Sequence, residues 1–323
     1  MCTSLDTKSP SDEEIQNLYS TFICLGPVAR TCLTTVSAKL GTEEYDARFK
    51  AYVTKIDNQI QSVSAKFQFG SLSNAVGCFE THKIIRMEPC LKNTAYTTEI
   101  ITRWIACRIL SSADCGAKER GYKIFQSLCQ HPTIRTSAGW FFEAYAHQWL
   151  RQGGRFEADM LSLKDSYETL SFGINFASPG EPQYYKTSTD LAGQLKNSGG
   201  KGVEHRLIGT YFQPRCPTQE SFDSLVVIDK DTLILFQITM AMTHEIKVDG
   251  VRAMVQALPQ TLKKVFIVFV IPEDRVENYQ RPQKAPTNND LRIRRREYTI
   301  KQFRLVFPND ELLSIAVPKP SVS

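Results

Sequence analysis

The chain has 323 residues, of which 42% are hydrophobic and 23% charged, and its formal net charge is +5. These values are near globular averages and predict about two domains with ample core. No run of about 20 apolar residues occurs, so a membrane-spanning helix is not expected.

The N-terminal segment carries acidic residues at positions 12–14 and has no basic stretch followed by an apolar core. No secretory signal is therefore predicted. We expect the protein in the nucleus or cytoplasm, while delivery into a host cell stays open. Eight of the nine cysteines lie before residue 130, and no Cys-x-x-Cys pair occurs. This pattern favours reduced, packed thiols over a zinc site.

Residues 1–131 predict a mostly helical region. A capping-box pattern precedes a first helix, and Thr42 precedes a longer helix whose apolar residues recur with a helical period. A short extended run follows at residues 83–87, and further helical patterns occupy residues 100–109 and 122–128. Residues 132–323 form the second predicted domain.

The second domain opens with a predicted helix from Ser137, as N-cap, to the glycine pair at 153–154. Glu143 and His147 are four residues apart and project from the same side of this helix. Glu143 stands within a broad apolar face, which is unusual for a surface carboxylate. The simpler interpretation is a surface Glu143 that pairs with Arg151 or His147.

Strands and helices alternate through the rest of this domain. Predicted strands occupy residues 155–163, 170–176, 206–212, 222–228, 232–239 and 264–271. A helix at residues 248–258 between the last two predicts a parallel crossover in a mixed sheet. Residues 178–202 are rich in Pro, Gly, Ser, Thr and Asn and predict a loop or insertion. The expected fold class is α+β or α/β, with a helical N-terminal region before a mixed sheet flanked by helices.

A hairpin is predicted around the polar tripeptide at residues 229–231, which separates two apolar, β-branched runs. Pairing across this turn brings Asp223 beside Gln237 at the far end of the two strands. A carboxylate, an amide oxygen and the carbonyl of Ile238 are ligands of the kind that Mg²⁺ takes, and such an ion supports phosphodiester hydrolysis. The alternative is a plain hairpin whose polar residues cap the strand ends.

Several runs in this domain also resemble a known family. They are residues 140–147, 153–156, 223–224, 235–239, 244–247 and 265–272. Their order and spacing resemble the endonuclease-like domain, of the PD-(D/E)XK superfamily, in Crinkler and retrotransposon-hot-spot effectors. The resemblance implies a restriction-endonuclease-like fold from about residue 136 onward. It also implies a Mg²⁺ or Mn²⁺ cofactor, DNA as substrate and Glu143 as the first acidic residue.

One position departs from that pattern. In this superfamily a lysine normally stands two residues after the second metal ligand, where it stabilises the attacked phosphate. Thr239 occupies that position here, and Lys247 is the nearest downstream lysine, expected on the following helix. A catalytically inactive endonuclease-fold module that binds nucleic acid or protein is therefore the alternative to a nuclease.

The same family commonly carries a P-loop ATPase module before the nuclease-like domain. Residues 25–30 are similar to the C-terminal helical part of that module, but the chain contains no Gly-x-x-x-x-Gly-Lys-Ser/Thr loop. That loop is needed because its backbone amides cradle the phosphates. We therefore expect a truncated copy, an incomplete gene model or a separately encoded tail, without ATP binding.

A basic segment lies between residues 281 and 304. Its densest part contains Arg292, Arg294, Arg295 and Arg296. Such a cluster can bind DNA phosphates through counterion release, or it can serve as a nuclear localisation signal. The alternative is a solvated loop and strand edge.

Overall fold

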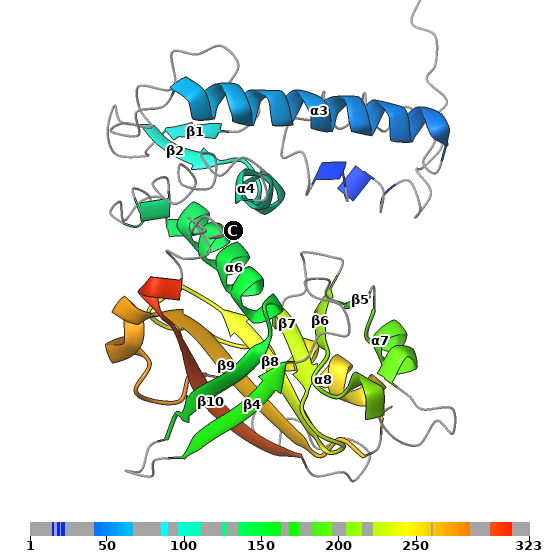
Figure 1. Ribbon diagram of the computed structural model, residues 1–323, viewed down its shortest axis with the longest axis vertical. Coiled ribbons are helices and arrows are strands. Elements are labelled where there is room, and N and C mark those ends of the chain that lie inside the picture. The colour runs from blue at the N-terminus through cyan, green and yellow to red at the C-terminus, as the bar shows by residue number, and fades with distance from the viewer. Residues whose placement is uncertain are drawn as a thin grey trace, which may run out of the picture. The chain divides into compact units, whose positions relative to one another are not determined.

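The computed structural model describes residues 15, 18–19, 21–22, 42–66, 85–89, 96–110, 125–126, 129, 135–162, 168–174, 183–185, 187–195, 205–214, 222–259, 261–284 and 298–311 (Figure 1). The chain forms two compact units, Met1–Phe141 and Phe142–Ser323. The sequence-based boundary at residues 131–132 stays a prediction. The similarity at residues 25–30 and the arginines at 292–296 lie outside the described residues.

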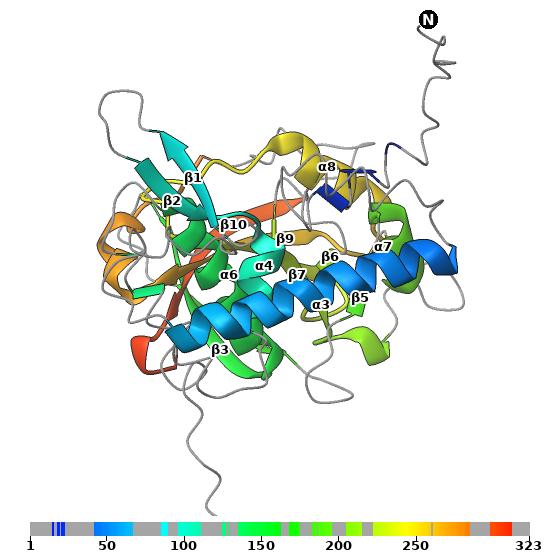
Figure 2. The same cartoon turned by 90° about the horizontal axis from the view of Figure 1, so that it is seen from above.

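The described residues of the first unit include two helices and a hairpin. They are α3 (Glu43–Lys66), β1 (Ile85–Pro89), β2 (Tyr96–Ile100) and α4 (Arg103–Leu110). Thr42 caps α3 as predicted, because the Tyr45 backbone N–H donates to Thr42 Oγ1 at 3.3 Å. β1 and β2 pair antiparallel, as Figure 2 also shows. The second strand was missed, so the prediction of helix and one extended run is incomplete here.

Helices α3 and α4 are joined by an ion pair and by aromatic contacts. Arg108 donates from Nε to Asp57 Oδ1 at 2.7 Å, and the second arm of the guanidinium reaches Oδ2 at 2.5 Å. The same guanidinium lies 4.9 Å from the ring centroid of Trp104, whose ring is 6.5 Å from that of Phe49. The bidentate carboxylate pair and the ring contact between Phe49 and Trp104 join the two helices, and the cation–π contact within α4 holds the guanidinium in place.

The second unit is built on one mixed sheet. Its strands follow the order β4-β3-β10-β9-β8-β7-β6-β5 in an 8-stranded sheet. Parallel neighbours are β8 and β9, β9 and β10, and β5 and β6, and the other neighbours are antiparallel. The strands are β3 (Gly154–Met160), β4 (Thr169–Ile174), β5 (Gln183–Tyr185), β6 (Tyr211–Pro214), β7 (Ser224–Val227), β8 (Thr232–Ile238), β9 (Lys264–Pro272) and β10 (Thr299–Phe307).

The helical elements of this unit follow the predicted pattern in part. They are α6 (Arg135–Arg151), which begins in the first unit, α7 (Ser188–Leu195), η4 (His205–Leu207), α8 (Val248–Ala257) and η5 (Glu273–Asn278). Gly153 and Gly154, with φ of 72° and 110°, end α6 as predicted. Ser137 lies inside α6, so its assignment as N-cap was wrong. Within the described ranges, no helix combines the length and apolarity needed to cross a membrane.

Three further sequence-based assignments need correction. The predicted loop at residues 178–202 contains β5 and α7, because Leu191, Ala192 and Leu195 bury one side of a short helix despite the polar composition. The predicted strand at residues 206–212 begins instead with η4. β10 was not predicted at all, although it fills the sheet between β3 and β9. The hairpin and the parallel crossover through α8 are confirmed.

The sheet is strongly curled. β4 and β8 are four steps apart in the strand order, which corresponds to roughly 19 Å across a flat sheet. The ring of Phe172 on β4 nevertheless lies 5.8 Å from that of Phe236 on β8. Only a sheet that curves back over itself brings these rings together, so the coarse expectation of a mixed α/β fold is confirmed with a curvature that the sequence did not indicate.

Both faces of the central strands are buried. On one face, α7 and α8 pack on alternate residues of β8 and β9, including Leu233, Leu235, Val265, Ile267 and Phe269. Because successive side chains on a strand point to opposite faces, Phe266 lies on the other face, where its ring is 5.2 Å from Phe303. There α6 contributes Phe142 and Trp149, whose rings lie 5.7 and 4.8 Å from Phe307. Burial on both faces explains the continuous apolar runs.

The turn between β7 and β8 yields a prediction about pH. Side-chain hydrogen bonds with Asp229, Thr232 and Lys264, and the charge of Lys264, lower the pKa of Asp231 from 3.8 to about 2. A lowered pKa stabilises the fold above pH 3.8, and this contribution is lost as pH falls through about 2. Asp231→Asn is therefore expected to unfold at lower denaturant concentration than wild type at pH 6, with the difference vanishing near pH 2.

Urea unfolding at several pH values checks this expectation. Lys264→Met is the companion variant, since it removes one hydrogen bond and one charge from Asp231 and leaves the turn backbone intact. It is expected to reproduce part of the pH dependence. An equal loss of stability for Asp231→Asn at pH 6 and pH 2 would contradict the prediction and assign the effect to the turn geometry alone.

Candidate active site

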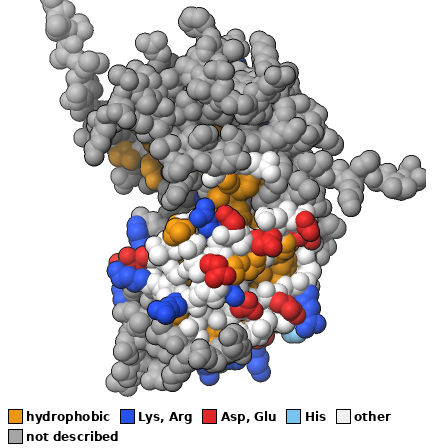
Figure 3. All heavy atoms as spheres, turned by 90° about the vertical axis from the view of Figure 1, so that its left-hand side faces the viewer, with side chains coloured by type: hydrophobic (Ala, Val, Ile, Leu, Met, Phe, Trp, Pro, Cys, Tyr) orange, Lys and Arg blue, Asp and Glu red, His pale blue; other side chains and the backbone are white. Residues whose placement is uncertain are grey.

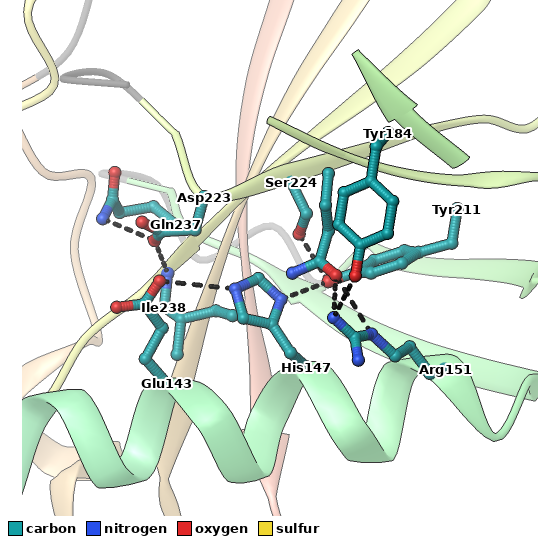
Figure 4. A network of polar contacts seen from close by, with 10 residues as sticks. Glu143, His147, Arg151, Tyr184, Tyr211, Asp223, Ser224, Gln237 and Ile238 are labelled. Atoms are coloured by element: carbon teal, nitrogen blue, oxygen red, sulfur yellow. Dashed lines mark hydrogen bonds and ion pairs between the residues drawn. The ribbon is translucent and has the colours of Figure 1, made fainter. Parts of the chain in front are cut away.

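The hairpin brings Asp223 and Gln237 into contact, as the sequence predicted. Asp223 Oδ2 accepts from Gln237 Nε2 at 2.9 Å and from the backbone N–H of Ile238 at 2.7 Å (Figure 4). The backbone N–H of Asp223 donates to the carbonyl of Phe236 at 2.8 Å. The two bonds to Oδ2 hold the carboxylate in one orientation, and the backbone bond fixes Asp223 at the end of β8.

The register of the two strands explains this contact. Ser224 on β7 stands opposite Phe236 on β8. Asp223 precedes that pair by one residue and Gln237 follows it by one, so both come to the same end of the hairpin. Gln237 is buried, with 7% of its surface exposed. A buried amide needs a hydrogen-bond partner, and Asp223 supplies it.

Helix α6 directs a second carboxylate toward this end of the sheet. Glu143, only 8% exposed, points toward Asp223 and Ile238 (Figure 4). Its Oε1 lies 3.3 Å from Nε2 of His147, one helical turn further along. Glu143 is thus buried and contacts His147, whereas Arg151 bonds elsewhere. The simpler interpretation was right about the contact with His147 and wrong about the surface position and the pairing with Arg151.

A chain of buried polar groups continues from His147 into the sheet. Nδ1 of His147 lies 2.7 Å from the hydroxyl of Tyr211 on β6, and this hydroxyl donates to Ser224 Oγ on β7 at 2.6 Å. Tyr211 and Ser224 have no exposed surface. Glu143, His147, Tyr211 and Ser224 therefore form one connected chain, called here the buried relay, that joins α6 to two strands.

The two carboxylates both act on the Tyr211 hydroxyl. Burial raises the pKa of Tyr211 far above its usual value; the hydrogen bond to Ser224 and the charge of Arg151 oppose this shift, and the charges of Asp223 and Glu143 add to it. Burial and the Asp223 charge likewise raise the pKa of Tyr185. Tyr211 is therefore a neutral phenol at neutral pH, and Glu143 and Asp223 share one electrostatic environment around it.

Arg151, at the C-terminal end of α6, hydrogen-bonds to side chains of β6 and β5, at the β5 edge of the sheet. Its Nε donates to Gln213 Oε1 at 3.0 Å, and its terminal nitrogen contacts the same oxygen and lies 3.4 Å from the Tyr184 hydroxyl. Tyr211, Ser224 and Gln213 were not identified from the sequence. Their spacing carries no signal, because their partners lie on α6, far away along the chain.

Thr239 and Lys247 lie in different surroundings. Thr239 is buried, its N–H donates to the Val270 carbonyl at 3.0 Å, and its Oγ1 accepts from the Ala241 N–H at 3.0 Å. A hydrogen bond to Thr239 partly offsets the burial that raises the pKa of Tyr279 to about 12. Lys247 is exposed and is the N-cap of α8, with extended backbone, so it stands at the start of the following helix.

The described part of the basic segment is largely paired with acids. Lys284 contacts Glu245 at 2.7 Å, and two residues of β10 contact acids on or beside the neighbouring strands: Lys301 with Glu168 at 2.7 Å and Arg304 with Asp159 at 3.4 Å. Figure 3 shows basic and acidic side chains intermixed over one face of the second unit. The nucleic-acid role of residues 292–296 stays a prediction.

The side chains at the hairpin end suit a hard divalent ion by their chemistry. Asp223 and Glu143 supply carboxylates, Gln237 an amide oxygen and Ile238 a backbone carbonyl, which is a typical all-oxygen ligand set for Mg²⁺. Both nitrogens of His147 have protein partners, Tyr211 and Glu143, so the imidazole is already engaged within the buried relay. Among the described residues, no group of three or more His, Cys, Asp or Glu side chains is placed to hold a metal ion.

Comparisons with protein-family models, with curated proteins and with solved structures found no match to this chain. The resemblance to the endonuclease-like effector domains therefore stays a prediction from the runs quoted above.

Proposed function

We propose that the second unit is a Mg²⁺-dependent, nuclease-like effector domain that acts on DNA phosphodiester bonds. The observation that carries the proposal is the Asp223 carboxylate, held by Gln237 and Ile238 at the end of a buried hairpin, with Glu143 directed toward it from α6. A restriction-endonuclease-like fold is the finer form of the same proposal. The mixed sheet, with α6 and α8 on its two faces, supports it.

In this proposal Asp223 and Glu143 hold the ion, with the oxygens of Gln237 and Ile238 completing the protein ligands. The bound Mg²⁺ would neutralise charge on the attacked phosphate and orient water. The two N–H donors on Asp223 Oδ2 keep the carboxylate fixed, so no reorganisation is needed when substrate arrives. Lys247 is assigned the cationic role that Thr239 cannot perform, since its ammonium is exposed.

A specific observation favours the alternative, an inactive module. Gln237 donates to Asp223, and this internal bond satisfies the carboxylate without any ion. Thr239 is engaged with the backbone of Ala241, so a lysine there would lose a hydrogen bond and bury a charge. Such a domain would keep the fold and bind nucleic acid or protein without cleaving it.

Two measurements on the full chain distinguish the nuclease from the inactive module. The first is calorimetric titration with Mg²⁺ and Mn²⁺, and the second is cleavage of supercoiled plasmid DNA with and without a chelator. The nuclease proposal expects one bound ion and chelator-sensitive nicking, reduced in Lys247→Ala. Ion binding without nicking favours the inactive module. Neither ion binding nor nicking by wild type, with correctly folded protein, rejects the nuclease proposal.

The arginines at 292–296 yield a prediction about affinity. Replacing Arg292, Arg294, Arg295 and Arg296 by Gln is expected to weaken DNA binding equally for unrelated sequences, since phosphate contacts carry no base information. The slope of log affinity against log salt should fall by up to about 4, roughly one for each lost phosphate contact. Fluorescence anisotropy at several salt concentrations measures both. An unchanged slope would assign these residues to another task, such as nuclear import.

A further inference from the structure

The buried relay contains more polar groups than packing at this place requires. Around it the same face of the sheet is aromatic: Phe236 lies 6.0 Å from the ring of Tyr211 and 5.8 Å from that of Phe172. Apolar side chains at positions 147 and 211 would pack there without any need for hydrogen bonds. Burying hydroxyl and imidazole groups instead costs free energy unless each is paired, and here each of them has a hydrogen-bond partner within the relay.

We propose that His147 is a positioning residue, held by Tyr211 and Ser224, whose Nε2 orients the Glu143 carboxylate toward the end of the hairpin. The inference rests on the proposed function, because it assigns the orientation a purpose, the binding of a divalent ion. It gives His147, Tyr211 and Ser224 a role in the site that neither the hairpin nor the resemblance assigned.

The geometry supports this role through the two ends of the imidazole. Nδ1 lies 2.7 Å from Tyr211 and Nε2 lies 3.3 Å from Glu143, so rotation of the ring breaks at least one contact. Tyr211 is in turn tied to Ser224 at 2.6 Å on β7, the strand that Asp223 precedes. The relay thus fixes the position of Glu143 on α6 relative to β7, the same strand that positions Asp223.

Residues that do not bind the metal themselves can orient a carboxylate that does, and the size of their effect on metal affinity is known. Groups that hydrogen-bond to a metal ligand fix its direction, and removing them typically weakens metal binding by about 10- to 100-fold. For Glu143 such help is needed, because a glutamate side chain has several rotatable bonds. Phe142 and Trp149 pack against Phe307 and fix the helix, but these ring contacts do not set the direction of the Glu143 carboxylate.

Two variants of His147 separate its two contacts. The amide nitrogen of Gln falls near the place of Nε2, and that of Asn near the place of Nδ1. His147→Gln therefore keeps a polar contact for Glu143 and loses Tyr211, whereas His147→Asn keeps the Tyr211 contact and loses Glu143. The readout is Mn²⁺ affinity by calorimetry on the full chain, with thermal melting measured in parallel.

We expect His147→Asn to weaken Mn²⁺ binding by about 10-fold or more, and His147→Gln, which loses only the Tyr211 anchor, to weaken it by no more than Tyr211→Phe does. Equal losses in the two variants, or losses that follow the melting temperature, would overturn the positioning role in favour of packing. If wild type binds no Mn²⁺, the proposed function fails and the inference with it. Binding lost in Glu143→Gln but equal in both His147 variants removes the inference alone.

Tyr211→Phe keeps the test decisive if the His147 variants do not fold. It removes a single oxygen atom from the relay and preserves the ring contact with Phe236. We expect a several-fold weaker Mn²⁺ affinity, because Nδ1 loses its anchor and the imidazole can turn away from Glu143. Unchanged affinity in a folded Tyr211→Phe protein would overturn the proposal.

Discussion

Asp223→Asn is expected to abolish divalent-ion binding and any metal-dependent cleavage while the second unit remains folded. The amide keeps one carbonyl oxygen that can accept from the Ile238 N–H, so the end of the hairpin stays closed. It removes the negative charge, however, and the neutral Gln237 cannot replace that charge. We expect at least about a 100-fold loss of Mn²⁺ affinity, since Mg²⁺-type sites depend on one or two carboxylates.

Asp229→Asn is the matched control for this experiment. It changes the same residue type in the same hairpin, at the opposite end, where the Asp229 Oδ1 accepts from the Asp231 N–H at 2.8 Å. The amide oxygen can keep that bond, so ion binding should be unaffected. Undiminished Mn²⁺ affinity in Asp223→Asn, measured by calorimetry on a protein with wild-type circular dichroism, would refute the metal site.

Phe236→Ala is expected to destabilise the second unit by roughly 3–5 kcal/mol. Phe236 is fully buried and its ring lies between Phe172 of β4 and Tyr211 of β6. Truncation leaves a cavity at the point where the curled sheet meets itself, and neighbouring strands cannot close it without changing their register. Urea denaturation followed by tryptophan fluorescence measures the loss.

Two further substitutions show whether the loss of stability in Phe236→Ala comes from the contact between the curled strands or only from the loss of side-chain volume. Phe236→Leu keeps most of the volume and is expected to cost less than half as much. Tyr184→Ala removes an aromatic ring that is 39% exposed, and is expected to cost less than about 1 kcal/mol. A Phe236→Ala loss no larger than that of Tyr184→Ala would mean that β4 and β8 do not pack on each other.

The local sequence pattern was sufficient to predict the hairpin and the parallel crossover. The polar tripeptide at residues 229–231 between two apolar runs determines the turn, and the period of two then determines which residues face each other. Asp223 and Gln237 are 14 residues apart and lie on either side of that turn, so their contact could be predicted from spacing alone. The same reasoning identified α8 and the parallel pairing of β8 with β9.

Composition misled the prediction where burial outweighs local preference. Residues 178–202 have the polar, glycine-rich composition of a loop, but three apolar residues are enough to dock α7 against the core. β10 carries Lys301 and Arg304 within a basic segment, and their charges suggested a surface that faces phosphates. The strand forms because β3 and β9 flank it and because Glu168 and Asp159 meet those charges.

The sequence by itself determined the hairpin, the residue types at its end and the helix that carries Glu143. Only the tertiary structure decided that His147 meets Tyr211, 64 residues away, and that Tyr211 meets Ser224. The physical reason is range: turn chemistry and side-chain period act between residues near in sequence. The buried relay instead depends on strand order and sheet curvature, which follow from the packing of the whole unit.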